Sequence, residues 1–158
     1  MLVASSMAAG QELQAALLEI DRRLSTLKAL HDHMEREEAR ADAGAFRAER
    51  KMRLLGNIKE NDDKDFVEAQ QWLASILQGG ATGFCEDARR ADKARWMLEI
   101  IHRGTLRICE EARILNEERN RLRDREEACE LAGYELAAAI ERVQKDLAAA
   151  VAAGFPCV

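Results

Sequence analysis

The chain has almost no proline. Its 158 residues include a single proline, Pro156, and aromatic residues make up 4% of the sequence. Proline breaks helices, and alternating runs of β-branched residues form strands. No such alternating run occurs, so the sequence predicts long uninterrupted helices and no strands. The abundance of Ala, Leu, Glu and Arg is typical of coiled coils, and we expect one all-α domain over residues 1–158.

Long apolar runs and an excess of basic charge are also missing. The apolar runs fall far short of the roughly 18 residues that span a membrane. The first ten residues lack the basic and apolar regions of a signal peptide. Charged residues make up 34% of the chain, with a formal net charge of −5, whereas nucleic-acid binding generally needs a basic face. We expect a soluble cytoplasmic protein with neither a membrane nor a nucleic-acid partner.

The four cysteines form neither a zinc motif nor a disulfide framework. None belongs to a C-x-x-C pair, the usual zinc-binding spacing. Cys109 and Cys129 fall on one predicted helix about 30 Å apart, far beyond the roughly 7 Å that a disulfide allows. We expect free thiols and neither a metal nor a cofactor. The histidine–glutamate pairs at i, i+4 spacing within residues 31–37 are the alternative position for a metal ion.

Two long heptad patterns dominate what the sequence does contain. The first keeps its phase from Leu13 to Leu55, and apolar residues at this spacing form the seam of a coiled coil. Gly56 follows as a natural helix end, which predicts a long helix over 11–56. A polar stretch comes next, and a short amphipathic segment then predicts a second helix over 62–78.

The second heptad pattern follows a glycine-rich stretch at residues 79–83. It predicts a long third helix over 84–152, because apolar residues recur at both seam positions throughout. A glycine at residue 104 and a capping pair that begins at residue 124 make a break near either position the alternative. A single long helix is the favoured interpretation.

Polar residues within the two seams suggest how the long helices pair. Glu38 interrupts the first seam and Arg119 the second, and His31 and Glu126 do the same. An antiparallel register in which paired residue numbers add up to about 157 joins both oppositely charged pairs. This register predicts that Glu38 faces Arg119 and that His31 faces Glu126.

The predicted fold is therefore an antiparallel coiled-coil hairpin, with about 11–56 against about 101–150 and a short helical head at one end. Apolar residues outside the seams, among them Leu106, Ile114 and Leu131, have no partner in such a hairpin. A helix with two apolar faces is usually packed between two partners. A homodimer that forms a four-helix bundle would cover these residues.

Both tryptophans fall in the predicted head, and tryptophan is enriched where proteins bind one another. The expected protein-binding residues are Trp72, Trp96, Ile100, Leu77 and Cys85; packing in the core is their alternative role. No nucleophile lies in a catalytic motif, so we expect no catalytic residue. The favoured function is a non-enzymatic adaptor, chaperone or assembly subunit that binds protein partners, including a second copy of itself.

A basic cluster suggests a different function. Its residues are close in sequence or brought together by the predicted register: Arg47, Arg50, Lys51, Arg103 and Arg107. Such a cluster attracts phosphates or other anions. It makes an anion- or nucleic-acid-binding module one alternative.

Acidic pairs suggest the other alternative. Glu35 and Glu38 form an E-x-x-E pair, and Glu60 and Asp63 form an E-x-x-D pair. The combination resembles the magnesium site of all-α nucleotide pyrophosphohydrolases of the MazG and dimeric dUTPase type. That resemblance implies a small Mg²⁺-dependent nucleotide hydrolase, in which carboxylates on helices hold the ion against substrate phosphates.

Overall fold

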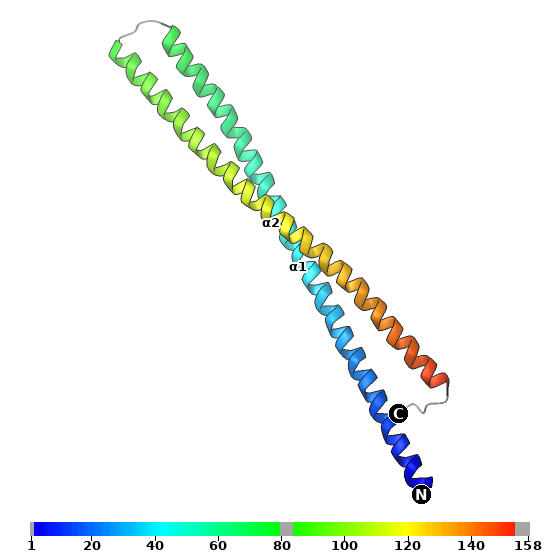
Figure 1. Ribbon diagram of the computed structural model, residues 1–158. Helices are drawn as coiled ribbons and strands as arrows, with labels where there is room; N and C mark the ends of the chain where they lie inside the picture. Colours follow the sequence, from blue (N-terminus) through cyan, green and yellow to red (C-terminus); the bar gives the residue numbers. More distant parts are fainter. Residues whose placement is uncertain (1, 80–83, 154–158) are drawn as a thin grey trace. The chain divides into compact units, whose positions relative to one another are not determined.

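Two long helices account for nearly all of the described chain. The computed structural model describes residues 2–79 and 84–153. Helix α1 spans Leu2–Gln78, and helix α2 spans Phe84–Ala152 (Figure 1). These ranges contain no strand. The prediction of an all-α hairpin with two long helices packed against each other is confirmed.

The chain divides into two compact units. Unit 1 comprises Met1–Asp42 and Arg123–Val158, and unit 2 comprises Ala43–Leu122. Each unit contains one segment of α1 and one segment of α2, and within the unit the two segments run antiparallel side by side (Figure 1). The candidate site described below lies within unit 2.

Helix α1 continues through the position where the sequence predicted its end. The predicted helices 11–56 and 62–78 are parts of one helix, so the described residues contain no separate short helical head. Gly56 is a helical residue and does not act as a cap. Helix α2 is likewise continuous past residues 104 and 124.

Polar residues at seam positions explain the wrong helix boundary. The heptad phase of α1 passes without a shift through Lys59 and Asp62 to Phe66 and Ala69. Lys59 also donates a hydrogen bond to Asp63, one turn further along, at 3.0 Å, and such i, i+4 pairs support a helix. The apolar pattern therefore ends near Gly56, whereas the helix continues.

The helices of unit 2 pair in a register that differs from the predicted one. A Cβ atom added to Gly44 would lie 3.0 Å from Cδ1 of Leu122, and one added to Gly104 would lie 3.8 Å from Oδ2 of Asp62. The residue numbers of each of these two pairs add up to 166. The predicted sum of about 157 is therefore wrong by more than two helical turns.

Unit 1 also departs from the predicted register. Arg123 donates a hydrogen bond to Asp42 at 2.8 Å, and the numbers of these two residues add up to 165. Glu126 accepts a hydrogen bond from Arg123 on its own helix at 2.6 Å. His31 Nδ1 lies 3.8 Å from a carboxylate oxygen of Glu35, also on its own helix. The predicted pairing of His31 with Glu126 is wrong.

Arg119, a polar seam residue of α2 in unit 2, also bonds to residues of its own helix. Arg119 donates hydrogen bonds to Asn116 at 2.6 Å and to Asn120 at 3.2 Å, both on α2. Its predicted pairing with Glu38 depended on the same incorrect register. Because such residues find partners one turn away on their own helix, they carry little information about the opposite helix.

Small side chains form the buried seam of unit 2. Ala45 and Ala94 are completely buried, and the neighbouring seam residues Ala48, Ala69 and Ala91 are almost so. Alanine at the seam lets two helix backbones approach closely, since a close-packed interior leaves little empty space. The larger apolar residues at seam positions, such as Leu55 and Leu115, are only half-buried.

The glycines of α1 allow a direct test of this close approach. At Gly56 an added Cβ would meet no atom within 4 Å, so Gly56→Ala should raise the free energy of unfolding by about 1 kcal/mol through helix propensity alone. Urea denaturation followed by circular dichroism would measure the gain. Gly44→Ala is the control, because its methyl group would press against Leu122 and offset the gain. Equal gains at both positions would contradict the close contact at Gly44.

The cysteines and the apolar content agree with the sequence predictions where they are described. Cys109 is an exposed free thiol and Cys129 a buried one. The side chain of Cys85, all of Cys157 and residues 80–83 of the glycine-rich stretch lie outside the described residues. Within the described residues, neither helix combines the length and the apolar character needed to cross a bilayer.

Candidate protein-binding groove

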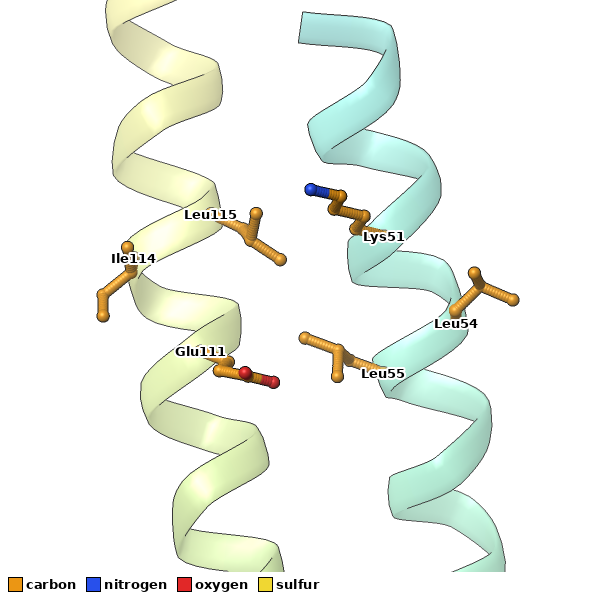
Figure 2. Close-up of a pocket in the computed structure, with 6 residues that line it drawn as sticks. All are labelled: Lys51, Leu54, Leu55, Glu111, Ile114 and Leu115. Carbon is orange, nitrogen blue, oxygen red and sulfur yellow. The ribbon is translucent and has the colours of Figure 1, made fainter. Parts of the chain in front are cut away.

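Two hollows lie along the line where the helices of unit 2 meet. Hollow A has a volume of about 560 Å³ (Figure 2). Its lining residues are Lys51, Leu54, Leu55, Glu111, Ile114 and Leu115. Hollow B has a volume of about 650 Å³. The residues that line it include Asp65, Glu68, Trp72, Trp96, Met97 and Ile100.

Hollow A is apolar on both helices. Figure 2 shows Leu55 and Leu115 extending into the space between α1 and α2, while Leu54 and Ile114 project away from the opposite helix. The outward pair is about half exposed, with 56% of Leu54 and 48% of Ile114 accessible to solvent. The hollow thus continues outward into an apolar surface that the hairpin itself does not cover.

Hollow B contains three of the residues expected to bind a protein partner. Trp72, Trp96 and Ile100 all line it, and Trp96 is 60% exposed. Leu77 is also exposed but does not line the hollow, and the side chain of Cys85 is not described. The structure therefore brings both tryptophans and Ile100 together in one apolar depression.

The two hollows repeat each other at a spacing of two heptads. The position of Lys51 in hollow A corresponds to that of Asp65 in hollow B, fourteen residues later on α1. On α2, the position of Ile100 in hollow B corresponds to that of Ile114 in hollow A, again fourteen residues later. Residues that share a heptad phase lie on the same face of a coiled coil. Ile58, exposed to 49%, lies between Lys51 and Asp65 in the same heptad phase. We call the surface that extends from hollow A to hollow B the groove.

The charged residues of the groove are unpaired. Lys51 and Glu111 line hollow A, and Asp65 and Glu68 line hollow B. None of these four takes part in an ion pair among the described residues. Elsewhere on α2, by contrast, Arg113 donates hydrogen bonds to glutamates three residues before it and four residues after it. The groove therefore offers both apolar contacts and free charge to a partner.

The predicted basic cluster is not assembled in unit 2. With paired residue numbers near 166, Arg103 and Arg107 lie opposite residues near 63 and 59, more than two turns from residues 47–51. The guanidinium of Arg103 also bonds to Glu99 on its own helix. Among the residues of this cluster, Lys51 lines hollow A, and Arg107 is exposed between the two hollows in the heptad phase of Ile100 and Ile114.

The acidic pairs do not form a two-helix ion site. Glu38 and Glu60 belong to the same helix, α1, about six turns apart. A magnesium site of the kind suggested by the sequence needs carboxylates that converge from facing helices. Asp63 instead accepts a hydrogen bond from Lys59 at 3.0 Å.

One small cluster matches the alternative metal position. His31, Asp32 and Glu35 offer ligand atoms that all lie within 4.8 Å of one another. His31 is half-buried, and the two carboxylates are exposed. All three side chains come from a single stretch of α1, and within the described residues the opposite helix contributes no ligand to them. Clusters of this kind are common on highly charged helices.

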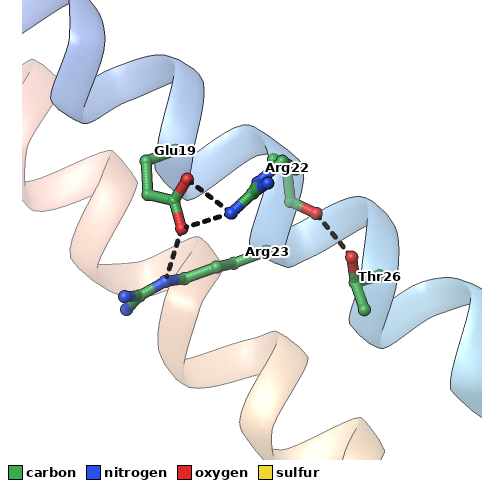
Figure 3. A network of polar contacts seen from close by, with 4 residues as sticks. All are labelled: Glu19, Arg22, Arg23 and Thr26. Carbon is green, nitrogen blue, oxygen red and sulfur yellow. Dashed lines mark hydrogen bonds and ion pairs between the residues drawn. The ribbon is translucent and has the colours of Figure 1, made fainter.

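The surface of unit 1 is closed by local ion pairs. Glu19 accepts hydrogen bonds from Arg22 and Arg23, and Thr26 donates one to the backbone carbonyl of Arg22 (Figure 3). The hydrogen bond from Arg22 is the main cause of a lowered pKa at Glu19. Arg22, Arg23 and Thr26 border a hollow of about 520 Å³ that Val143 of α2 also lines. Charged groups that satisfy one another here contrast with the free charges of the groove.

Glu37 joins the two helices of unit 1. Arg40 donates a hydrogen bond to it at 2.7 Å, and Arg125 of α2 donates another. The hydrogen bond from Arg40 is the largest cause that lowers the pKa of the Glu37 carboxyl, and the charge of Arg125 adds to it. The interaction therefore stabilises the folded chain while Glu37 is ionised.

The lowered pKa of Glu37 predicts a dependence of stability on pH. Its contribution is fully present above the ordinary carboxyl pKa of 4.5 and is lost as the pH falls through the lower folded value. The melting temperature of the wild type should therefore fall more steeply between about pH 5 and pH 3 than that of Glu37→Gln. Thermal melts followed by circular dichroism would measure both slopes. Glu135→Gln, at an exposed position without an ion pair, should keep the wild-type slope; identical slopes for all three chains would contradict the prediction.

Comparisons with protein-family models, with curated proteins and with solved structures find no match to this chain. The described residues form an all-α helical hairpin, and the groove is an apolar surface that the hairpin leaves uncovered.

Proposed function

We propose that this protein is a non-enzymatic helical interaction module, acting as an adaptor, chaperone or assembly subunit, whose groove binds protein partners. The observation that carries the proposal is the exposure of Trp72, Trp96 and Ile100 in one hollow beside a seam of buried alanines. Each unit has only two helix segments in the described residues, so nothing within the unit covers the exposed parts of these side chains.

The energetics favour a partner that covers the groove. Burying a large apolar side chain contributes about 1.5–3 kcal/mol, and tryptophan is among the residues that contribute most at interfaces. Leu54, Ile58 and Ile114 extend the apolar surface away from the tryptophans. Contiguous exposed apolar surface of this kind marks an interaction site on a folded protein.

The shape of the groove indicates the kind of partner. It runs along the line between two antiparallel helices, and its lining residues recur with a heptad period. A helix with apolar residues at matching spacing would fit such a groove, and further helices would complete a bundle. The partner is therefore expected to present helices rather than an extended peptide.

Substitution of Ile100 tests the proposal. Immobilised wild-type chain should capture defined partners from an extract of its source cells, to be identified by mass spectrometry. Ile100→Asp should lose at least about 90% of that capture, because a charge in hollow B is costly to bury. Leu106→Asp is the matched control, since Leu106 is also about half exposed on α2 but lines neither hollow. Equal capture by both variants would contradict the role of the groove, and Mg²⁺-dependent nucleotide turnover lost in Glu38→Gln would favour an enzyme.

A further inference from the structure

Hollow A carries a lysine and hollow B carries two carboxylates, and both hollows expose apolar side chains. We infer that the occupant of the groove is a second copy of this chain, which docks antiparallel so that hollow A of each copy packs against hollow B of the other. The inference rests on the proposed function, since it identifies the partner of the same surface.

The two-heptad repeat creates the symmetry that such a dimer needs. On α1 the midpoint between the residues of the two hollows is residue 60, and on α2 it is residue 106. These two numbers add up to 166, as do the observed pairs of unit 2, so both midpoints lie at one level. A twofold axis at this level, across the helices and in the plane of the interface, exchanges hollow A with hollow B and pairs each helix with its own copy.

The surface at the axis suits close contact. Ile58 is 49% exposed there and presents apolar surface to the partner. Gly104 lies at the same level on α2 and has no side chain, and the nearest atom to an added Cβ, Oδ2 of Asp62, would be 3.8 Å away. Arg107, exposed three residues further on, turns its side chain out of the contact where the two copies of α2 cross.

Apolar residues face apolar residues on the α2 side of the dimer. The axis at residue 106 sets Ile114 of one copy at the level of residue 98 of the other, between Met97 and Ile100. Trp96 lies beside the same position in hollow B. The dimer thus contains two equivalent contacts, and in each of them hollow A of one copy covers hollow B of the other.

Opposite charges meet on the α1 side. The axis at residue 60 sets Lys51 of one copy at the level of residue 69 of the other, beside Glu68 and within a turn of Asp65. Glu111 lies on α2, where hollow B contributes Ile100 and no carboxylate. The second copy therefore supplies the charge partner that Lys51 and the carboxylates of hollow B lack within unit 2, while Glu111 faces apolar residues.

The charges also select the antiparallel arrangement over a parallel one. In a parallel dimer hollow A would pack on hollow A and Lys51 would face Glu111. Each α1 would then pack on α2 of the other copy, so Asp65 and Glu68 of hollow B would be buried against Trp96 and Ile100 without a base. Burying unpaired carboxylates is unfavourable, whereas the antiparallel dimer places Lys51 beside the carboxylates of hollow B.

Sedimentation equilibrium of the full chain tests the self-association. The wild type should be a dimer, and Ile100→Asp should raise its dissociation constant at least about tenfold. Leu106→Asp should leave it unchanged, because Leu106 lies at the level of the axis but outside the heptad phases that line the groove. A wild type that stays monomeric at 100 µM and above would overturn the inference. If that monomer still captured another protein through Ile100, the proposed function would stand with a different partner; if it captured nothing, both would fail.

Charge exchange tests the arrangement. Lys51→Glu and Glu68→Lys should each weaken the dimer about tenfold, and the double variant Lys51→Glu, Glu68→Lys should restore most of the affinity. Exposed positions keep the fold intact, which circular dichroism of each variant would verify. The double variant Lys51→Glu, Glu111→Lys is the control and should not recover affinity. Recovery in this control, or a purely additive loss in the first double variant, would overturn the antiparallel arrangement.

Discussion

Replacing Ala45 by leucine should lower the free energy of unfolding by about 2 kcal/mol or more. Ala45 is completely buried at the seam of unit 2, so three additional carbon atoms would have to separate the helices or take strained rotamers. Separation would also weaken the contacts of the neighbouring alanines, because they depend on the same close approach. Urea denaturation followed by circular dichroism would measure the loss.

The control for this substitution lies on the same helix. Ala43 is exposed, so Ala43→Leu keeps helix propensity nearly constant and inserts nothing between the helices. It should change the free energy of unfolding by less than about 0.5 kcal/mol. A similar loss in both variants would mean that the alanine seam is not the closely packed region of unit 2.

A disulfide cross-link should report the register as an all-or-none result. In a chain whose native cysteines are replaced by alanine, Gly44→Cys with Leu122→Cys should form an intramolecular disulfide on mild oxidation, since the two positions face each other. A disulfide requires Cα atoms within roughly 7 Å. Mass spectrometry of dilute protein would detect the loss of two hydrogens.

The comparison variant tests the register expected from the charged seam residues. Gly44→Cys with Arg113→Cys joins positions whose numbers add up to 157, and we expect it to stay reduced as a monomer. In the observed register Arg113 lies about nine residues from the level of Gly44, or roughly 13 Å along the helix. Cross-linking of this pair in place of the first would contradict the structure of unit 2.

The helical character of the chain could be predicted from its sequence because the heptad pattern is a local property. The scarcity of proline and the recurring apolar positions predicted two long antiparallel helices, and both are present. The boundary after Gly56 could not be predicted in the same way. Lys59 and Asp62 occupy seam positions. A pattern defined by apolar residues therefore stops at these positions, although the helix continues through them.

The register could not be obtained from complementary charges. Arg119 and His31 are satisfied by residues on their own helices, so matching them across the hairpin had no physical basis. The contacts that determine the register involve Gly44 and Gly104, whose effect depends on how closely the backbones approach. A glycine in a sequence does not show whether it faces a partner or solvent.

The candidate site was predicted in part. Trp72, Trp96 and Ile100 were expected to bind a partner, and the structure places them in one hollow. Hollow A was not expected, because Leu54 and Ile114 become neighbours of one surface only in the observed register. A search for exposed apolar residues that repeat at a spacing of two heptads would have suggested it.

The hairpin geometry also has a consequence for the folding pathway. Ala69 and Met97 of hollow B are fewer than thirty residues apart in sequence, whereas the hydrogen bond from Arg123 to Asp42 joins residues 81 apart. Closing a longer loop costs more conformational entropy, so contacts nearest to the end of α1 and the start of α2 form with the smallest loss. Each contact then shortens the loop that the next one has to close. Folding should therefore proceed like a zipper from Gln78 and Phe84 towards Asp42 and Arg123, and a defect in hollow B would slow folding more than an equal defect near the chain ends.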